Sequence, residues 1–251
     1  MPKKSRSQRI KQIKKIYDYK KRIFDQIKKN DLIKKAENSN LNGSDKLNLK
    51  LMKDRFEYFD SIPYEKIKKK AALAIECEGV WREAKEKSNF KLVQKNLLDL
   101  VNQIKEESEI LSQKKNKKKY DCLLSNYDRS LDTKQLFKIF KRIEKFISNK
   151  LPLIEKKQKT FSYLELKENL SEEDQFKLSK IFMKKLGFDF NKGRIDKSHH
   201  PFCGGSSEDI RITTRFDEND SFSCFDALMH ETGHALYEQS LPKKGMNQPI
   251  A

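Results

Sequence analysis

The sequence lacks features that would mark a membrane or a secreted protein. It has no apolar run of the roughly 20 residues that a membrane-spanning helix needs. The basic N-terminus, Met1–Arg22, is not followed by the apolar segment of a secretory signal. Its four cysteines, Cys77, Cys122, Cys203 and Cys224, form no CxxC pair and match no zinc module. We therefore expect a cytoplasmic protein with free thiols and no membrane contact.

Charge is abundant and unevenly distributed. The chain has 55 Lys and Arg against 37 Asp and Glu, a net charge of +18. Residues 190–251 contain seven basic and nine acidic residues, a net of −2, so residues 1–189 carry +20. Such a region could bind nucleic acid or a membrane surface. Because the lysines are spread through the helical segments and no base-reading module is present, we favour a solvated helical surface and expect no nucleic-acid partner.

Apolar periodicity predicts a mainly α-helical chain. Ser171 is expected to cap one helix, and Gly187 to terminate it. The glycines at 193, 204 and 205 indicate loops, and Ile210–Phe216 alternates as a strand does. Helices are expected at about 7–36, 63–84, 133–147, 171–186 and 222–239, with a charged loop at 114–119. Two more helices are expected around the apolar positions between Leu47 and Phe59 and between Leu92 and Ile104. The expected layout is a helical, basic body over 1–189, followed over 190–251 by loops, a small β element and a last helix.

The last helix carries the most informative motif, His230-Glu231-Thr232-Gly233-His234. Two His four residues apart lie on one helix face and can bind the same tetrahedral zinc ion. Glu231 points to the flank of that face, where it can take a proton from the attacking water rather than bind the metal. Two of the chain's four His have this spacing, which favours a zinc peptidase site over a surface helix with unrelated His.

Two other features near the motif have open interpretations. His199 and His200, in a loop before Pro201, could donate hydrogen bonds in the transition state or could be ordinary loop residues. The strand Ile210–Phe216 could hold an extended peptide along its edge, although an ordinary edge strand is favoured by its pattern alone. A metal-ligand role for Cys203 and Cys224 is not favoured, because their spacing fits no known site.

Three blocks in order resemble the carboxypeptidase Taq family of thermostable metallocarboxypeptidases. They are His200-Pro201-Phe202, Asp209-Ile210-Arg211-Ile212-Thr213-Thr214, and His230-Glu231-Thr232-Gly233-His234 followed by Ala235-Leu236-Tyr237-Glu238-Gln239. Weaker matches lie upstream at Trp81–Ala84, Tyr120–Leu124 and Leu186–Phe190. The resemblance therefore extends over essentially the whole chain.

The resemblance implies a mostly helical peptidase that removes single residues from peptide C-termini with broad specificity. It implies zinc, with cobalt sometimes functional in its place, and a homodimer at full length. By this analogy His230 and His234 are metal ligands and Glu231 is the base. The substrate side of the site would include His200, Asp209, Arg211, Thr213 and Thr214.

One element of the family pattern is missing. Such enzymes need a third protein ligand, a Glu on a later helix, together with an Arg motif for the substrate's terminal carboxylate. Only 17 residues follow His234, and the only acid among them, Glu238, lies one turn further along the same helix. We therefore expect a single incomplete peptidase domain, the N-terminal half of the family sequence, with little activity of its own. The end at Ile250–Ala251 falls where the ligand helix should begin.

Two alternative functions remain. An oligopeptidase or endopeptidase could use the same zinc core. A basic binding protein could retain a vestigial motif, and its binding to nucleic acid would depend steeply on salt.

Overall fold

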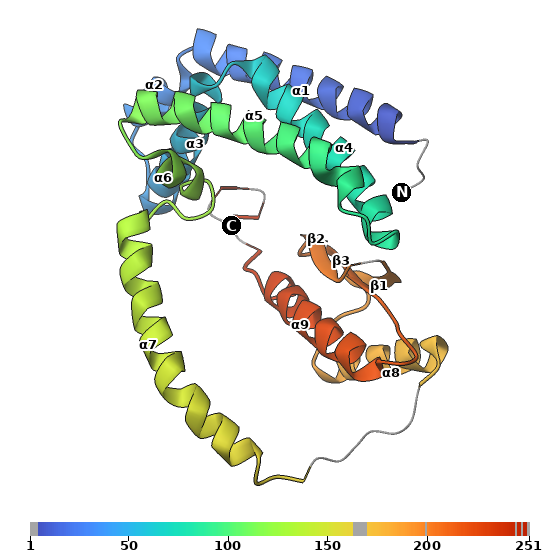
Figure 1. Cartoon of the computed structure of the whole chain (residues 1–251). Coiled ribbons are helices and arrows are strands. Elements are labelled where there is room, and N and C mark those ends of the chain that lie inside the picture. Colours follow the sequence, from blue (N-terminus) through green and yellow to red (C-terminus); the bar gives the residue numbers. More distant parts are fainter. Residues whose placement is uncertain (1–4, 163–169, 199, 244, 247, 250–251) are drawn as a thin grey trace. The chain divides into compact units, whose positions relative to one another are not determined.

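The computed structural model describes residues 5–162, 170–198, 200–243, 245–246 and 248–249. The chain divides into two compact units, Met1–Phe161 (unit 1) and Ser162–Pro249 (unit 2). The described part of unit 1 is helical, whereas unit 2 combines two helices with a three-stranded sheet (Figure 1). The predicted mainly α fold with a small β element before the motif helix is confirmed. His199 and Ile250–Ala251, on which the sequence makes predictions, lie outside the described residues.

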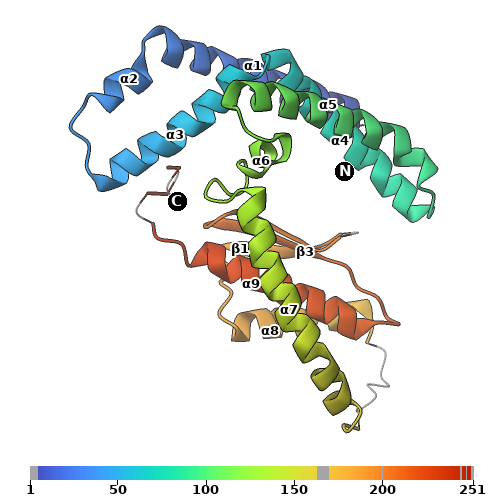
Figure 2. The ribbon, with the colours of Figure 1, turned by 60° about the vertical axis from the view of Figure 1, so that its left-hand side comes forward.

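Unit 1 is a set of helices followed by one long helix. In both views α7 leads away from the helices that precede it (Figures 1 and 2). The helices are α1 (Arg6–Lys29), α2 (Leu32–Glu37), α3 (Gly43–Ser61), α4 (Tyr64–Glu86), α5 (Lys91–Lys115), α6 (Lys119–Leu124) and α7 (Thr133–Gln158).

Three predicted boundaries in unit 1 are wrong. The helix predicted to end at about Ile147 continues as α7 to Gln158. The single helix expected over 7–36 is broken, because Asp31 adopts a left-handed conformation with φ of 52°. A short polar side chain tolerates that conformation, so the apolar periodicity continues across a real turn. The charged loop expected at 114–119 is also shorter than predicted. It contains only three residues, among them Asn116 with φ of 49°, which ends α5.

The core of unit 1 consists of two small clusters. Ile62, Ile67, Leu111 and Cys122 form one of them, with four half-buried aromatic residues packed around it. Cys77, Ala84 and Val93 form the other between α4 and α5. None of these clusters includes a residue of α7, which has no buried residue.

Unit 2 contains α8 (Glu172–Lys185), β1 (Gly193–Lys197), β2 (Phe202–Ser206), β3 (Asp209–Thr214) and α9 (Ser221–Gln239). The strand order is β1-β3-β2, with β1 parallel and β2 antiparallel to β3. The predicted strand is confirmed as β3, but it is the central strand, so the expectation of an edge strand is wrong.

The sequence missed β1 and β2 because their glycines suggested loops. These glycines instead allow the strands to approach each other closely. A Cβ at Gly193 would collide with the carbonyl of Ile210, and one at Gly205, where φ is 128°, with the carbonyl of Asp209. The loops predicted at residues 193 and 204–205 are therefore wrong.

The predicted end of α8 is confirmed. Ser171 accepts a hydrogen bond from the amide of Asp174 at the helix start. Gly187 has φ of 100°, and the next amide, of Phe188, donates to the carbonyl of Met183 at 2.9 Å. This turn places Phe188 in the core of unit 2 together with Met183 and the central strand.

Candidate metal centre

Helix α9 packs on one face of the sheet. The two His of its motif lie on the side of the helix that faces away from the sheet. Leu228 and Ala235 are fully buried and share a cluster with Ile210 and Ile212 of β3. Residues two positions from Leu228 point away from this contact, because each helical residue advances by about 100°. His230 accordingly lies on the exposed side of α9, as does His234.

The two His side chains converge. Their Nε2 atoms lie 3.2 Å apart, and their ring planes are inclined by 79° with centroids 4.9 Å apart. Two Nε2 ligands at about 2.05 Å from zinc, with a tetrahedral angle between them, would be separated by about 3.3 Å. The rings therefore already have the separation that a shared zinc ion requires, and the donor set fits that ion.

Glu231 follows His230 on α9, about 100° further around the helix, and is half-buried. Cys203 of β2 packs against the unit 2 core. Burial raises the pKa of the Cys203 thiol, and the negative charges of Glu231 and Glu238 raise this pKa further. The charge of Glu231 therefore acts on the thiol of Cys203 across the boundary between α9 and β2.

The described residues supply no third ligand. Among them, no group of three or more His, Cys, Asp or Glu side chains is arranged to hold a metal ion. Glu238 lies seven residues, about two turns, beyond Glu231 on the same flank of α9. The centre in this part of the chain is therefore a pair of ligands with an adjacent carboxylate.

The candidate residues on β3 divide between the two faces of the sheet. Thr214 is fully buried with Ile210 and Ile212, on the face that packs against α9. Asp209, Arg211 and Thr213 alternate with them and lie on the opposite face.

The exposed face of the sheet carries two separate polar pairs. Arg211 donates to Asp209 through Nε at 3.2 Å and Nη2 at 2.9 Å, which lowers the pKa of the Asp209 carboxyl. Thr213 donates its hydroxyl to the backbone carbonyl of His200 at 2.9 Å. Within the described residues, no hydrogen bond or ion pair joins either pair to His230 or its motif.

The sequence did not predict that Cys203 packs against the core that α9 helps to form. Its spacing predicted a free thiol and gave no reason to place it near the motif. Its location depends on β2 pairing with β3, which brings Cys203 opposite Ile212 on the face covered by α9. A glycine-rich strand gives too weak a pattern for that pairing to be predicted.

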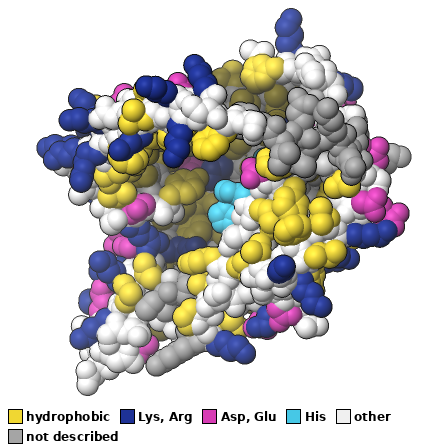
Figure 3. Space-filling model, turned by 90° about the horizontal axis from the view of Figure 1, so that it is seen from below, with side chains coloured by type: hydrophobic (Ala, Val, Ile, Leu, Met, Phe, Trp, Pro, Cys, Tyr) yellow, Lys and Arg dark blue, Asp and Glu magenta, His cyan; other side chains and the backbone are white. Residues whose placement is uncertain are grey.

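The basic charge of the chain is concentrated in unit 1. Residues 1–161 contain 43 Lys and Arg against 22 Asp and Glu, a net of +21. Figure 3 shows Lys and Arg scattered over one face of the molecule and mixed with acidic side chains, with His side chains also at the surface.

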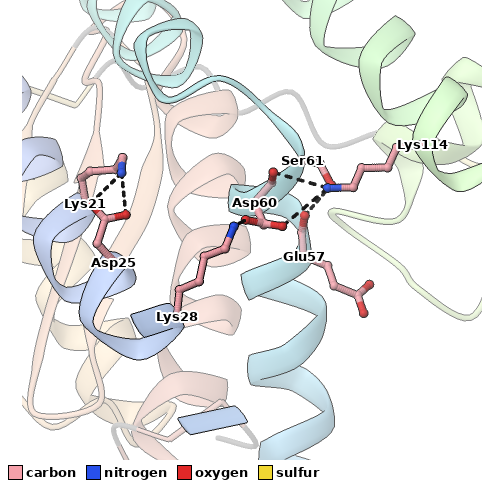
Figure 4. A network of polar contacts seen from close by, with 7 residues as sticks. All are labelled: Lys21, Asp25, Lys28, Glu57, Asp60, Ser61 and Lys114. Atoms are coloured by element: carbon pink, nitrogen blue, oxygen red, sulfur yellow. Dashed lines mark hydrogen bonds and ion pairs between the residues drawn. The ribbon is translucent and has the colours of Figure 1, made fainter. Parts of the chain in front are cut away.

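Many of these lysines have acidic partners. Asp60 accepts from Lys28 at 2.6 Å and lies 3.6 Å from Lys114, as drawn in Figure 4. A cavity of about 600 Å³ beside Asp60 is lined by both lysines and carboxylates. This mixed surface agrees with the solvated-surface interpretation. No described helix is long and apolar enough to span a membrane.

Comparison with known proteins identifies the family. The family model for the carboxypeptidase Taq (M32) metallopeptidases matches residues 1–251. The chain belongs to this family. Bacillus subtilis carboxypeptidase 1 is 32% identical over 199 residues, which are 77% of this chain and 38% of that protein. Thermostable carboxypeptidase 1 of Pyrococcus furiosus is 29% identical over 225 residues, which are 88% of this chain and 45% of that protein.

Solved structures of M32 enzymes match the same part of the fold. Trypanosoma cruzi metallocarboxypeptidase 1 aligns with a TM-score of 0.79 and 31% identity, over 100% of this chain and 51% of its own. A structure described as BsuCP aligns with a TM-score of 0.78 and 28% identity, over 99% of this chain and 50% of its own. The chain thus spans about half the length of its M32 relatives.

Proposed function

We propose that the chain is part of a zinc-dependent metallocarboxypeptidase that releases C-terminal residues from peptides with broad specificity. The observation that carries this proposal is the 3.2 Å separation of the His230 and His234 Nε2 atoms on α9. Membership of the M32 family supports the peptidase chemistry. Zinc is the metal that two imidazoles one helical turn apart favour, and cobalt is an alternative.

Each residue of the motif has a distinct task. His230 and His234 would hold the ion through Nε2. A bound zinc ion supplies Lewis acidity, which polarises the scissile carbonyl and makes water more acidic. Glu231 takes the proton of the attacking water through its carboxylate and delivers it to the leaving amine. Its position on the helix flank keeps this carboxylate free for proton transfer.

The site is completed by groups in the other half of the enzyme. We propose that a Glu on a later helix supplies the third ligand, and that an Arg there holds the substrate's terminal carboxylate. Residues 1–251 would then be one incomplete peptidase domain that binds zinc weakly and hydrolyses little. The complete enzyme would be a cytoplasmic homodimer acting on peptides.

The residues of the sheet would serve the substrate side. Asp209, Arg211 and Thr213 share an exposed face, and Thr213 fixes the backbone of His200. Because Arg211 is already paired with Asp209, it would contact a substrate only as part of that pair. Thr214 is buried, so its contribution would be to position β3 against α9.

A pair of peptides tests the reaction. The enzyme completed with a second half should release the last residue of a peptide with a free C-terminus and leave the same peptide intact when its C-terminus is amidated. Equal cleavage of both peptides would instead identify an oligopeptidase or endopeptidase. Nucleic-acid binding that falls steeply with salt and is unaffected by Glu231→Gln would support a binding protein.

A further inference from the structure

Helix α7 carries an apolar stripe along one side. The stripe is formed by residues spaced three and four apart, so they share one helix face. Phe137, Phe140 and Phe146 are 66%, 61% and 63% exposed. The members of the stripe are Leu136, Phe137, Ile139, Phe140, Ile143, Phe146, Ile147, Leu151 and Ile154.

The opposite side of α7 is basic. Lys138, Lys141 and Lys145 lie on it, roughly 100–160° around the helix from Phe140. The helix has eight Lys and Arg but only two acidic residues. This division is typical of a helix with one face in water and the other against an apolar partner.

The stripe is too long to be an incidental surface feature. At 1.5 Å per residue, the 26 residues of α7 extend about 39 Å. Contiguous exposed apolar patches of this kind mark interaction sites on soluble proteins. A helix also gains most of its stability from packing its apolar face, not from intrinsic propensity.

The comparisons indicate what covers this face. The Trypanosoma cruzi and BsuCP structures align with essentially the whole of this fold, α7 included, and each chain continues for about the same length again. We propose that the α7 stripe is the docking surface for the polypeptide that corresponds to the second half of the M32 enzymes. This proposal rests on the proposed function, because the same half would supply the third zinc ligand.

Other occupants are less well supported. A basic amphipathic helix can lie on an anionic membrane, and two copies of the chain could pair through their stripes. Neither explains why structures that contain this fold have twice the length. The match in length favours a polypeptide partner.

The test mixes residues 1–251 with the separately produced second half of Bacillus subtilis carboxypeptidase 1. Light scattering should detect a 1:1 complex. Amide hydrogen exchange in residues 136–154 should slow by about tenfold or more on mixing. Docking that stabilises α7 against local opening by about 1.4 kcal/mol or more reduces the exchange rate by that factor.

Two double variants locate the surface. Phe140→Ser with Ile147→Ser, in the stripe, should weaken the complex at least tenfold. Lys141→Ser with Lys145→Ser, on the basic side of the same helix, should leave it nearly unchanged. Because the four side chains are exposed, far-UV circular dichroism should find the same helix content in both.

Four results would overturn the proposal. One is the absence of a complex, or a complex insensitive to the stripe variants. Another is protection of α7 by phosphatidylserine vesicles but not by the second half. The third is slow amide exchange in α7 that appears only as the concentration of residues 1–251 alone is raised, which would indicate pairing with a second copy. The last is slow amide exchange in α7 of residues 1–251 alone at every concentration, which would indicate that the same chain covers the stripe.

The failure of this proposal can be distinguished from the failure of the proposed function. If the mixture hydrolyses peptides with zinc and the stripe variants are equally active, the function stands and the docking surface is wrong. If a complex forms through the stripe but neither binds zinc nor hydrolyses peptides, the docking surface stands and the function is wrong.

Discussion

The Nε2 atoms of His230 and His234 lie 3.2 Å apart on the exposed face of α9. The buried contacts of Leu228 and Ala235 with the sheet orient the helix so that this face is free. The ligand pair is thus arranged by the fold of unit 2, and metal binding requires little rearrangement of it.

Glu231→Gln should separate metal binding from catalysis. The amide cannot take a proton, so hydrolysis by the enzyme completed with a second half should fall by about 100-fold or more. Zinc content, measured by mass spectrometry of the metal, should be unchanged. Glu238→Gln, two turns further along α9, is the control and should keep its activity. Full activity of Glu231→Gln would exclude it as the base.

The thiol of Cys203 should report the charge of Glu231. Burial and the two nearby carboxylates raise the pKa of this thiol. Replacing Glu231 with Gln removes one negative charge, so this pKa should fall and alkylation at pH 8 should be faster in metal-free protein. Cys77, whose thiol pKa is raised by burial alone, is the internal control. An unchanged rate at Cys203, resolved by mass spectrometry, would mean that the charge of Glu231 does not act on this thiol.

Lys70→Met should strongly destabilise unit 1. Lys70 and Tyr58 donate to Glu107, whose side chain is 1% exposed. Without the lysine, a buried carboxylate loses its charged partner, which costs about 3–5 kcal/mol in the free energy of unfolding.

The neighbouring pair of Lys66 and Glu106 provides a matched control, because it is exposed. Lys66→Met should change the free energy of unfolding little, since exposed ion pairs are solvated and screened. Urea denaturation measures both variants. Similar effects at the two positions would contradict the role assigned to burial.

Asp60 should make stability depend on pH in the acid range. Hydrogen bonding to Lys28 holds the pKa of Asp60 below its usual value, and Lys114 acts in the same direction. A carboxyl with a lowered folded-state pKa stabilises the fold above its unfolded pKa of about 3.9. That stabilisation is lost as the pH falls through the folded-state pKa.

Comparison with Asp60→Asn isolates this effect. The wild type should be more stable near pH 6 by no more than about 1 kcal/mol, because Asp60 is one-third exposed. The difference should vanish at low pH. Asp25→Asn, in an exposed pair with Lys21, controls for the lost charge. A difference that grows on acidification would have the wrong sign.

The sequence predicted the helices and the motif because strong local patterns encode them. The apolar spacing of α9 and the His230–His234 repeat are visible without tertiary information. The strand β2 and the packing of Cys203 against the core of unit 2 depend on pairing across the sheet, which glycines permit but do not signal. The break at Asp31 depends on a backbone conformation that apolar periodicity does not register.

The central claim is that His230 and His234 form part of a zinc site that a second half completes. It is tested most directly by measuring the zinc that residues 1–251 retain after gel filtration, alone and mixed with the second half of Bacillus subtilis carboxypeptidase 1. The account predicts weak binding alone, one retained equivalent together with hydrolysis in the mixture, and loss of both in His234→Ala. Tight, stoichiometric zinc with normal turnover by residues 1–251 alone would contradict it.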